Sequence, residues 1–255
     1  MISVITVSFN SAATIEDTIK SVLCQTYKDL EYIIVDGGST DGTIDIIKKY
    51  GDRISRWVSE KDRGIYDAMN KGISMATGDV IGFLNADDFY AGSSILSKVA
   101  GILDNTGADS CYGDLLYVDP VNAEVKRYWK SGEYDPRLFY NGWMPPHPTF
   151  FVRRAIYERH GLFNLALGSA ADYELMLRFL LRHGISTCYI PEILVKMRSG
   201  GMSNASIGNR LRANRMDRLA WDVNGLNPQL WTLWMKPLRK VGQFFSAPNQ
   251  RIGEK

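Results

Sequence analysis

The chain has 255 residues, of which 45% are hydrophobic and 23% are charged, and its formal net charge is +2. A chain of this length and composition can bury a substantial core, which excludes a disordered or fibrous protein. It favours one α/β domain, with or without an appendage, and with so balanced a charge we expect no nucleic-acid partner.

Cysteine usage and the amino terminus bear on the compartment. Cys24, Cys111 and Cys188 are far apart and form no C-x-x-C pair, so neither a zinc site nor a disulfide framework is predicted. Residues 1–7 lack the features of a secretory signal. No uninterrupted apolar run approaches the roughly 20 residues that cross a bilayer. We therefore expect a reduced, cytoplasmic protein.

Apolar runs alternate with helical patterns over the first third of the chain. Four runs are predicted to be buried strands: residues 3–9, 30–35, 54–58 and 80–84. Between them, apolar residues recur at helical spacing over residues 15–23, 44–50 and 65–76. This alternation is typical of right-handed βαβ units, so the predicted fold class is α/β with a mostly parallel central sheet. Ligands gather at the carboxyl ends of the strands in such sheets.

The middle of the chain predicts an addition to that sheet. A helix over residues 95–103 leads to strands at 110–118 and 125–129 that are separated by a turn, which predicts a small antiparallel addition. Residues 141–148 are rich in Gly, Pro and aromatic residues and predict an irregular loop. A strong helical pattern over residues 171–183 completes the predicted core.

The carboxyl-terminal part differs in charge. We end the main domain at residue 203 and treat residues 204–255 as a helical extension. From Ile207 onward there are nine basic and three acidic residues, so this tail carries +6 and the rest −4, which predicts an anionic partner for the tail alone. An apolar stripe runs along it: Leu230, Trp234, Leu238, Val241 and Phe245. The stripe either packs on the main domain or lies in an anionic membrane interface, making the protein peripheral on the inner face of the membrane; both alternatives remain open.

Two predicted strands end in acidic residues. Residues 80–84 run directly into Asn85-Ala86-Asp87-Asp88, and Asp36 follows residues 30–35. A buried strand that ends in an amide and two carboxylates brings oxygen ligands to the edge of a sheet. Mg²⁺ or Mn²⁺ prefers such ligands, takes one or two from the protein, and completes its shell with water and substrate phosphates. Taken alone, Asp87 and Asp88 would more often start a turn or cap a helix.

Several motifs occur in one order between residues 3 and 201. They are V-S-F-N (7–10), I-I-V-D-G-G-S-T-D-G-T (33–43), D-R-G-I-Y-D-A-M-N-K-G-I (62–73), G-D-V-I-G-F-L-N-A-D-D (78–88) and A-D-Y-E-L-M-L-R (171–178). On these motifs the chain resembles family 2 glycosyltransferases with the GT-A fold, similar to bacterial enzymes of polysaccharide (colanic-acid-type) biosynthesis. The resemblance implies transfer of a sugar from a UDP-, GDP- or dTDP-sugar to a saccharide acceptor, expected to be lipid-linked, with Mn²⁺ or Mg²⁺ as cofactor.

The resemblance also implies roles for residues of the donor site. It implies that Asp36 binds the nucleoside and that the backbone of Thr6, Val7 and Ser8 lies beside the base. Asp62 and Arg63 are assigned to the base or phosphate. The resemblance implies that Asp87 is the principal metal ligand and that Asp88 supports it. Asn85, followed by Ala86, stands where the family often has its first carboxylate, and the amide oxygen of Asn85 can bind the metal or the ribose.

Acceptor activation is implied by the A-D-Y-E-L motif. The family's corresponding acidic residue deprotonates the acceptor hydroxyl, which makes Asp172 the candidate general base. Ala171 replaces the usual preceding acid, so the choice between Asp172 and Glu174 stays open. Without the resemblance, an Asp at a helix start would be interpreted as a cap. His147 either lines the acceptor pocket, completes the metal shell or is a packed loop histidine.

Two other functions remain as alternatives. A sugar-nucleotide pyrophosphorylase has a similar α/β domain but is expected to carry an early Gly-rich basic loop, which residues 7–13 lack. An inactive nucleotide-sugar-binding module would explain Asn85 and Ala171. The preferred prediction is a metal-dependent, inverting glycosyltransferase of cell-surface polysaccharide biosynthesis.

Overall fold

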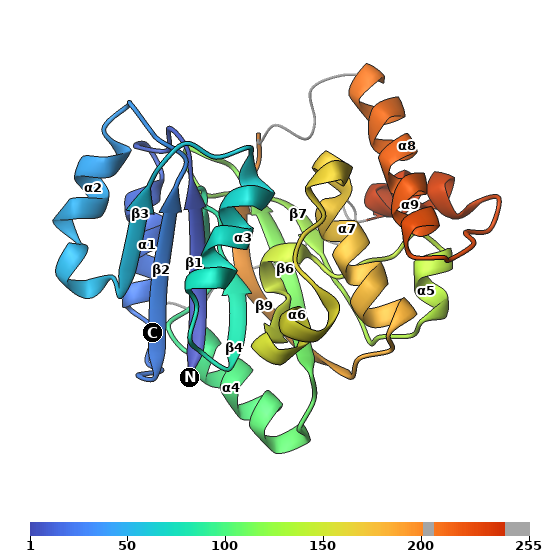
Figure 1. The fold of residues 1–255 in the computed structure, drawn as a ribbon, viewed down its shortest axis with the longest axis horizontal. Helices are drawn as coiled ribbons and strands as arrows, with labels where there is room; N and C mark the ends of the chain where they lie inside the picture. Colours follow the sequence, from blue (N-terminus) through green and yellow to red (C-terminus); the bar gives the residue numbers. More distant parts are fainter. Residues whose placement is uncertain (201–206, 243–255) are drawn as a thin grey trace.

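The computed structural model describes residues 1–200 and 207–242. In this part of the chain, one sheet has the strand order β3-β2-β1-β4-β8-β6-β9-β5, with β7 paired to β6. Figure 1 shows helices on both sides of it. The strands are β1 (Ile2–Ser8), β2 (Leu30–Asp36), β3 (Arg56–Ser59), β4 (Val80–Phe83), β5 (Asp88–Tyr90), β6 (Ser110–Val118), β7 (Val125–Trp129), β8 (Phe151–Arg153) and β9 (Thr187–Arg198).

The sheet has a parallel half and a mixed half. Strands β3, β2, β1 and β4 pair in parallel. β8 then runs antiparallel to both β4 and β6, β7 runs antiparallel to β6, and β9 is parallel to β6. The predicted α/β fold with a parallel sheet and an antiparallel addition is therefore confirmed.

Helices cover both faces of the sheet and create two cores. They are α1 (Ile15–Leu23), α2 (Thr43–Lys49), α3 (Ile65–Met75), α4 (Ile95–Thr106), α5 (Arg137–Tyr140), α6 (Arg154–His160), α7 (Ala171–Met176), α8 (Ile207–Val223) and α9 (Thr232–Gly242). Buried residues of α1, α2 and α4 belong to one core, and those of α3, α6, α7 and α8 belong to the other. Short helices η1 (Gly51–Arg53), η2 (His147–Thr149) and η3 (Leu165–Ala170) and a π-helical turn, η4 (Leu177–Arg182), complete the chain.

Strand β1 illustrates why the predicted strands are continuous apolar runs. Ile2 and Val4 point into one core while Ile5 and Val7 point into the other, and all four are buried. Burying each such side chain stabilises the fold by about 1.5–3 kcal/mol. Helix α3 lies so close to β1 that a Cβ at Gly72 would be 2.4 Å from Cγ2 of Ile5, so this helix is fixed against the centre of the sheet.

The sequence did not predict two strands. The first is β9, which lies between β6 and β5 in the sheet. The second is β5, which begins at Asp88, so the last residue of the acidic segment after β4 is already part of a strand. The predicted helix over residues 171–183 is present as α7, which continues into η4.

The carboxyl-terminal helices pack against α7 and the loops around it. Trp221 of α8 is fully buried, and its indole N–H donates to the hydroxyl of Tyr173 at 3.0 Å. The hydroxyl of Thr232 in α9 donates to the carbonyl of Tyr140 at 2.7 Å. A Cβ at Gly142 would lie 2.4 Å from the backbone nitrogen of Lys236, so α9 is closely docked. Figure 1 shows α8 and α9 beside α5 and α7. The predicted domain boundary at residue 203 lies outside the described residues and stays a prediction.

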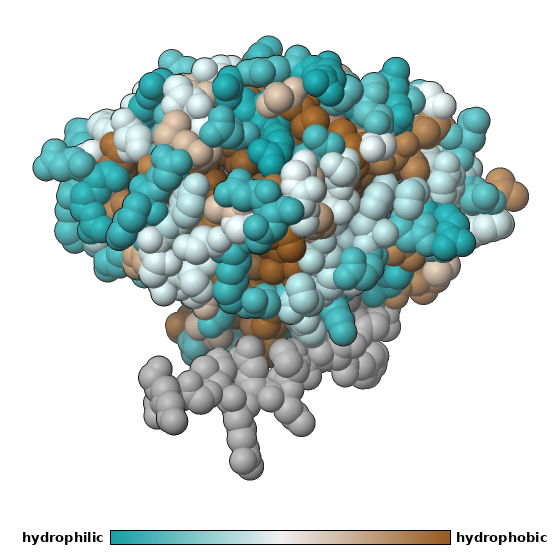
Figure 2. All heavy atoms as spheres, turned by 90° about the horizontal axis from the view of Figure 1, so that it is seen from below, coloured by the Kyte–Doolittle hydropathy of each residue, from teal (hydrophilic) through white to brown (hydrophobic). Residues whose placement is uncertain are grey.

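Figure 2 views the molecule from below, the end at which β1 starts in Figure 1. Hydrophilic residues cover much of this face, and hydrophobic residues reach the surface as separate groups between them. The carboxyl ends of β1 and β2 lie at the opposite end of the molecule. Parallel sheets bind their ligands at the carboxyl ends of their strands, so the candidate site is expected at that end of the molecule.

Candidate active site

The carboxyl ends of β1, β2 and β4 lie side by side. Ser8, at the end of β1, pairs in register with Asp36, at the end of β2. On the other side of β1, the backbone N–H of Ala86 donates to the carbonyl of Val7 at 3.2 Å. Neighbouring strands are about 5 Å apart. The structure thus brings Asp36 and the segment that contains Asp87 to one edge of the sheet.

The carboxylate of Asp36 is fully buried and accepts five hydrogen bonds. Oδ1 accepts from the hydroxyls of Ser8 at 3.0 Å and Ser39 at 2.5 Å. Oδ2 accepts from the hydroxyl of Ser59 at 2.7 Å and from the backbone N–H groups of Gly38 and Ser39. Burial opposes the charge, but these bonds outweigh it and lower the pKa of Asp36. Asp36 therefore shapes the glycine turn, and its predicted contact with a nucleoside requires one of these donors to move.

Asp62 and Arg63 lie beside that turn. Oδ1 of Asp62 accepts the N–H of Gly64 at 2.8 Å, and a Cβ at Gly37 would lie 2.5 Å from its Oδ2. The side chain of Arg63 is 79% exposed, and its guanidinium pairs with Asp67 at 3.0 Å. Arg63 therefore offers an accessible cation close to the turn after β2, whereas Asp62 holds the turn's backbone.

The side chains at the end of β1 divide between the core and the surface. Thr6 and Val7 are buried, and the hydroxyl of Thr6 is 3.1 Å from that of Tyr32, so only the backbone here can face a ligand. Phe9 follows the strand and is 64% exposed, with its ring 3.4 Å from the Cβ position at Gly37. Phe9 was not predicted as a site residue. The available signal was a bulky aromatic residue directly after a buried strand.

Asn85, Asp87 and Asp88 form the acidic segment after β4. Asp88 is fully buried, and its Oδ2 accepts Nδ2 of Asn85 at 3.3 Å. Burial raises the pKa of Asp88 well above its ordinary value, and the charge of Asp87 raises it further. Burial also raises the pKa of Asp87, whose backbone carbonyl accepts a guanidinium N–H of Arg198 at 3.0 Å. Ala86, between Asn85 and Asp87, is buried.

The donor set of this segment fits a hard divalent cation. Oδ1 of Asn85 and Oδ1 of Asp88 are buried and have no hydrogen-bond partner, an arrangement that a bound cation relieves. Among the described residues, no three His, Cys, Asp or Glu side chains gather closely enough to hold a metal by themselves. A cation here would need ligands from water and substrate phosphates, as Mg²⁺ sites commonly do.

Asp172 lies at the start of α7, partly exposed, with Oδ1 accepting the N–H of Tyr173 at 2.7 Å. Burial and the nearby charge of Asp172 raise the pKa of the phenol of Tyr66, from α3. His147 stacks on Phe83 with ring centroids 5.5 Å apart. Burial lowers the pKa of His147, and the nearby charge of Asp172 opposes this effect. The structure therefore brings His147 close to Asp172.

The pKa of Tyr117, in β6, responds to charges from both regions. Burial raises this pKa, Arg127 opposes that effect, and the carboxylates of Asp88 and Asp172 both raise it further. Neither Tyr66 nor Tyr117 was predicted as a site residue, because each stands in an ordinary apolar pattern.

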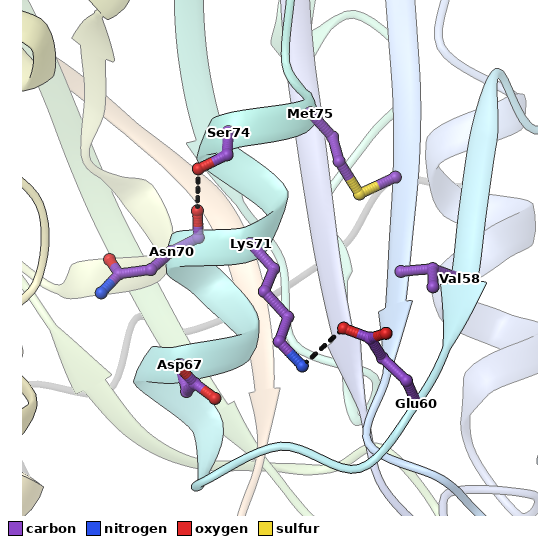
Figure 3. A pocket seen from close by; sticks show the side chains of 7 residues that line it. All are labelled: Val58, Glu60, Asp67, Asn70, Lys71, Ser74 and Met75. Carbon is purple, nitrogen blue, oxygen red and sulfur yellow. Dashed lines mark hydrogen bonds and ion pairs between the residues drawn. The ribbon is translucent and has the colours of Figure 1, made fainter.

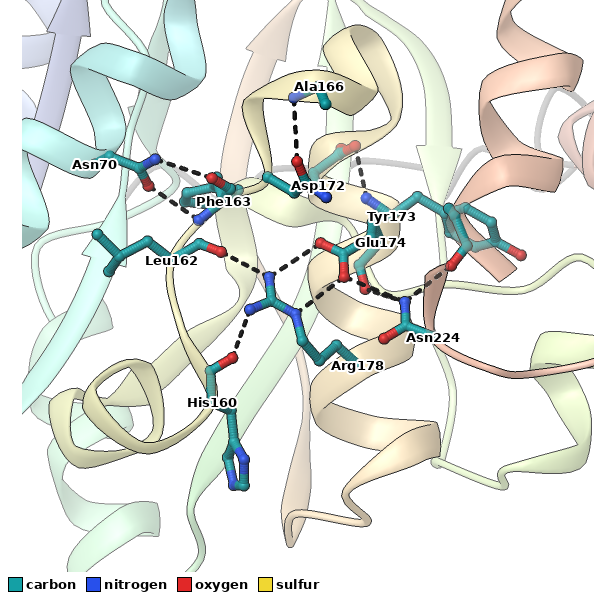
Figure 4. Close-up of polar contacts among 12 residues, drawn as sticks. Asn70, His160, Leu162, Phe163, Ala166, Asp172, Tyr173, Glu174, Arg178 and Asn224 are labelled. Atoms are coloured by element: carbon teal, nitrogen blue, oxygen red, sulfur yellow. Dashed lines mark hydrogen bonds and ion pairs between the residues drawn. The ribbon is translucent and has the colours of Figure 1, made fainter. Parts of the chain in front are cut away.

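Glu174 is bound to its neighbours in the buried layer beneath α7. Its two oxygens accept Nε and Nη2 of Arg178, each at 3.0 Å, and Nδ2 of Asn224 adds a contact at 3.2 Å. Arg178 also donates to the carbonyls of His160 and Leu162. Figure 4 shows this network apart from the carboxylate of Asp172. Glu174 is only 3% exposed, so its surroundings suit a structural ion pair.

A groove of about 530 Å³ lies beside α3. Figure 3 shows that it runs between α3 and the segment after β3, with Glu60 and Lys71 facing each other at 2.8 Å. It includes Asp67 and Asn70 but none of the predicted donor, metal or base residues. This groove is therefore separate from the candidate active site.

Comparison with known proteins identifies the family to which the chain belongs. The model of the family described as Glycosyl transferase family 2 matches residues 3–161. The chain belongs to this family. It is therefore a glycosyltransferase, and the pyrophosphorylase alternative is wrong.

Curated relatives extend the similarity beyond the matched model. A PGL/p-HBAD biosynthesis glycosyltransferase of Mycobacterium bovis is 30% identical over 212 residues, which cover 81% of this chain and 80% of the relative. An uncharacterized glycosyltransferase of Mycobacterium tuberculosis is 33% identical over 187 residues, covering 71% of this chain and 69% of that protein.

Solved structures confirm the GT-A fold. The Staphylococcus aureus TarS fragment 1–349, in complex with UDP-GlcNAc, superposes with a TM-score of 0.69 at 20% identity, covering 96% of this chain and 73% of the fragment. This chain spans 44% of the longer TarS chain. The mannosyltransferase PcManGT from Pyrobaculum calidifontis, in complex with GDP-Man and Mn²⁺, gives 0.64 at 19% identity, with 96% and 70% coverage. Within the described residues, none of the helices combines the length and apolar character of a membrane span.

Proposed function

We propose that this glycosyltransferase moves a sugar from a nucleoside diphosphate donor to a saccharide acceptor, with inversion at the anomeric carbon and dependence on Mn²⁺ or Mg²⁺. The observation that carries the proposal is the pair of buried oxygens without hydrogen-bond partners, Oδ1 of Asn85 and Oδ1 of Asp88, in the segment after β4 that lies at the same sheet edge as Asp36. An inverting transfer needs a base and a diphosphate site on either side of the reacting sugar, because attack and departure occur on opposite faces.

The donor is a UDP-, GDP- or dTDP-sugar held over the ends of β1 and β2. The exposed ring of Phe9 offers a face for the base, and the exposed guanidinium of Arg63 offers a partner for a phosphate. Asp36 and Asp62 fix the turn between them through their hydrogen bonds. The fold neighbours support this assignment, since the TarS fragment holds UDP-GlcNAc and PcManGT holds GDP-Man.

We assign the metal to Asp87 and Asp88, with the amide oxygen of Asn85 as a further ligand. A bound cation would offset the charge that builds on the departing nucleoside diphosphate. Asn85 orients Asp88 through its Nδ2, which leaves Oδ1 of each residue without a protein donor. The Mn²⁺ in the PcManGT complex supports a metal of this kind.

Asp172 acts as the general base. It takes the proton from the acceptor hydroxyl while the hydroxyl oxygen bonds to the anomeric carbon and the nucleoside diphosphate leaves from the other face. Glu174 is unsuited because Arg178 binds both of its oxygens. His147 lies nearby with a lowered pKa, so it is neutral at pH 7 and can hydrogen-bond the acceptor.

The acceptor is lipid-linked, and α9 holds the protein on an anionic membrane surface. Trp231, directly before α9, and Trp234 and Leu238 of α9 fall at the spacing of one helical face and are 51%, 67% and 61% exposed. Leu230, just before the helix, is 91% exposed. Trp and Leu beside basic residues suit a helix that lies in an anionic interface. The protein would then work peripherally on the inner face of the membrane, in polysaccharide biosynthesis.

A screen of nucleotide sugars tests the proposal. One donor is expected to raise the Tm of the protein only with Mn²⁺, because a ligand at 100 times its Kd stabilises the folded state by about 2.7 kcal/mol. Transfer from that donor to saccharide acceptors should stop in EDTA and give the inverted anomer by NMR. Full transfer in EDTA would exclude the metal. A retained anomeric configuration would exclude direct displacement. Donor binding without transfer to any acceptor tested would favour the inactive binding module.

A further inference from the structure

The turn after β1 and the turn after β2 are joined by hydrogen bonds in both directions. The backbone N–H of Asn10 donates to Oγ of Ser39 at 2.7 Å, and Oδ1 of Asn10 accepts the backbone N–H of Thr40 at 2.9 Å. Two residues further along the first turn, the N–H of Ala12 donates to Oδ2 of Asp41 at 3.0 Å. The two turns are thus fixed to each other at the sheet edge where the donor is proposed to bind.

Asn10 has a backbone conformation that few residues adopt. Its φ is +48°, in the left-handed region, and among the described residues Ala123 is the only other non-glycine residue with a positive φ. Asparagine tolerates this region better than most residues do. A residue with positive φ bends the chain away from the line of the preceding strand. The two hydrogen bonds of Asn10 to the second turn stabilise that bend.

The hydroxyl of Ser39 connects Asn10 with the buried carboxylate of Asp36. It accepts the N–H of Asn10 and donates to Oδ1 of Asp36 at 2.5 Å. The same Oδ1 also accepts the hydroxyl of Ser8, two residues before Asn10. A hydroxyl that donates and accepts at once has a fixed orientation. The backbone at Asn10 is therefore tied to the end of β2 as well as to the end of β1.

Phe9 lies between these fixed points. Its neighbours Ser8 and Asn10 are held by the hydrogen bonds described above, whereas its own side chain is 64% exposed. Cδ2 of the ring lies 3.4 Å from the position that a Cβ at Gly37 would occupy, so the absence of a side chain at Gly37 leaves the ring room beside the second turn. An exposed ring gains little from packing. Its direction therefore depends chiefly on the backbone on either side.

We propose that Asn10 is the positioning residue of the Phe9 ring: its hydrogen bonds to Ser39 and Thr40 hold the ring in the orientation on which the base of the donor stacks. This inference rests on the proposed function, which gives the face of Phe9 to the base. Asn10 does not itself touch the nucleotide. A ring that is already oriented binds more tightly, because the apparent Kd is the intrinsic Kd divided by the fraction of molecules in the binding conformation.

The test compares two substitutions of Asn10 in the full chain. Asn10→Gly accepts the positive φ without strain but removes the side-chain bond to Thr40, whereas Asn10→Ala removes the bond and also disfavours that φ. The probe is the nucleoside diphosphate, from UDP, GDP and dTDP, that raises the Tm of the wild type most. Its Kd, measured by calorimetric titration with Mn²⁺, should rise about 3-fold in Asn10→Gly and about 10-fold in Asn10→Ala. Equal Kd values for the wild type and Asn10→Ala would overturn the proposal.

Inorganic pyrophosphate with Mn²⁺ is the matching probe that lacks a base. Its Kd should change by less than about twofold in both variants, since the ring is not part of the proposed phosphate and metal site. A rise as large as that for the nucleoside diphosphate would show general damage to the turns and overturn the inference.

Asn122→Ala is the matched control variant. Oδ1 of the exposed Asn122 accepts the N–H of Glu124 at 3.1 Å, in the turn before β7, so a bond of the same kind is lost away from the site. This variant should bind both probes as the wild type does. A rise in the nucleotide Kd equal to that of Asn10→Ala would also count against the proposal.

Phe9→Ala separates this inference from the proposed function. Loss of the ring should raise the Kd of the nucleoside diphosphate by about 5-fold or more, the usual contribution of one stacked base. In that background, Asn10→Ala should change the Kd by less than about twofold, because no ring remains to be oriented. A further rise of about 10-fold there would give Asn10 a role apart from the ring and overturn the inference alone. An unchanged Kd in Phe9→Ala by itself would instead remove the ring from the proposed donor site.

Discussion

Asp172 and Glu174 lie two positions apart on α7, yet their surroundings give them different uses. Glu174 is buried between Arg178 and Asn224, whereas Asp172 is partly exposed. A carboxylate held by both nitrogens of a guanidinium fork is poorly placed to accept a proton from a substrate. The same residue type is therefore structural at one position and a candidate base at the other.

This contrast predicts opposite results for two conservative substitutions. Asp172→Asn should fold with nearly unchanged stability and lose transfer activity by about 100-fold or more, since the base is removed. Glu174→Gln should lower the free energy of unfolding by about 3 kcal/mol, because the largely buried guanidinium of Arg178, whose side chain is 12% exposed, loses its counter-charge. Urea denaturation and initial rates measure the two effects. If Glu174→Gln is stable but inactive, the roles of the two residues must be exchanged.

The proposed metal ligand Asp87 leads to a further prediction for a single residue. We expect Asp87→Ala to abolish transfer and to remove the Mn²⁺-dependent part of the thermal stabilisation by donor, since a metal ligand is lost. The exposed Asp104 supplies a control, and Asp104→Ala should behave as the wild type. Calorimetric titration with Mn²⁺ in the presence of nucleoside diphosphate provides the measurement. Unchanged Mn²⁺ binding by Asp87→Ala would show that the cation binds elsewhere.

At the scale of elements, α9 has two faces with different partners. Thr232 is buried, and Lys236 pairs with Asp217 and lies 3.5 Å from the ring centroid of Tyr173. Trp234 and Leu238 of the predicted apolar stripe are exposed instead. The helix therefore docks through one face, while the stripe faces away from the domain. Phe245 lies outside the described residues, and the side chain of Val241 is not described.

The exposed face of α9 predicts membrane binding that depends on its tryptophans. Replacing Trp231 and Trp234 by serine should reduce co-sedimentation with vesicles of phosphatidylglycerol by about 10-fold or more, because burial of apolar surface in the interface is lost. Val121, which is 93% exposed in the turn before β7, gives the control Val121→Ser. Equal sedimentation of the double variant and the wild type would end the membrane assignment.

Strand β9 is the element that sequence patterns did not identify. Its residues do not alternate cleanly between buried and exposed, and Pro191 interrupts them. The pairing with β6 shifts register there, from Gly113 opposite Ile190 to Asp114 opposite Ile193. A bulge thus accommodates the proline, which cannot donate to a strand. Only pairing with a distant strand makes this segment regular.

At the scale of the whole molecule, Asp36 contributes to the stability of the fold and also fixes the turn after β2. The pKa of Asp36 is lower in the folded state than in the unfolded state. The charged carboxylate therefore stabilises the fold at pH values above the unfolded pKa of about 3.9, and this stabilisation is lost as the pH falls through the folded pKa. Asp36→Asn should therefore be less stable than the wild type at pH 7. The difference in free energy of unfolding should narrow as the pH falls below about 4. Urea denaturation between pH 3 and 7 measures this, and a gap independent of pH would contradict the assignment.

The proposed site draws on two parts of the chain. The parallel half supplies the turn after β2 and the acidic segment, and the region from β6 onward supplies Tyr117, His147 and Asp172. In this proposal, donor binding and base chemistry come from different parts of the chain. Contacts of α3 with both parts explain why a single helix can connect them.

The sequence by itself determined the α/β class, the first four strands and the position of the acidic segment, because strands buried on both faces are continuous apolar runs. It also predicted Asp172 as a candidate. Tertiary structure alone paired Glu174 with Arg178, left Asp172 partly exposed and filled the acceptor positions of Asp36. Those outcomes depend on partners from distant parts of the chain, such as Asn224 for Glu174 and Ser59 for Asp36, which local residue patterns do not specify.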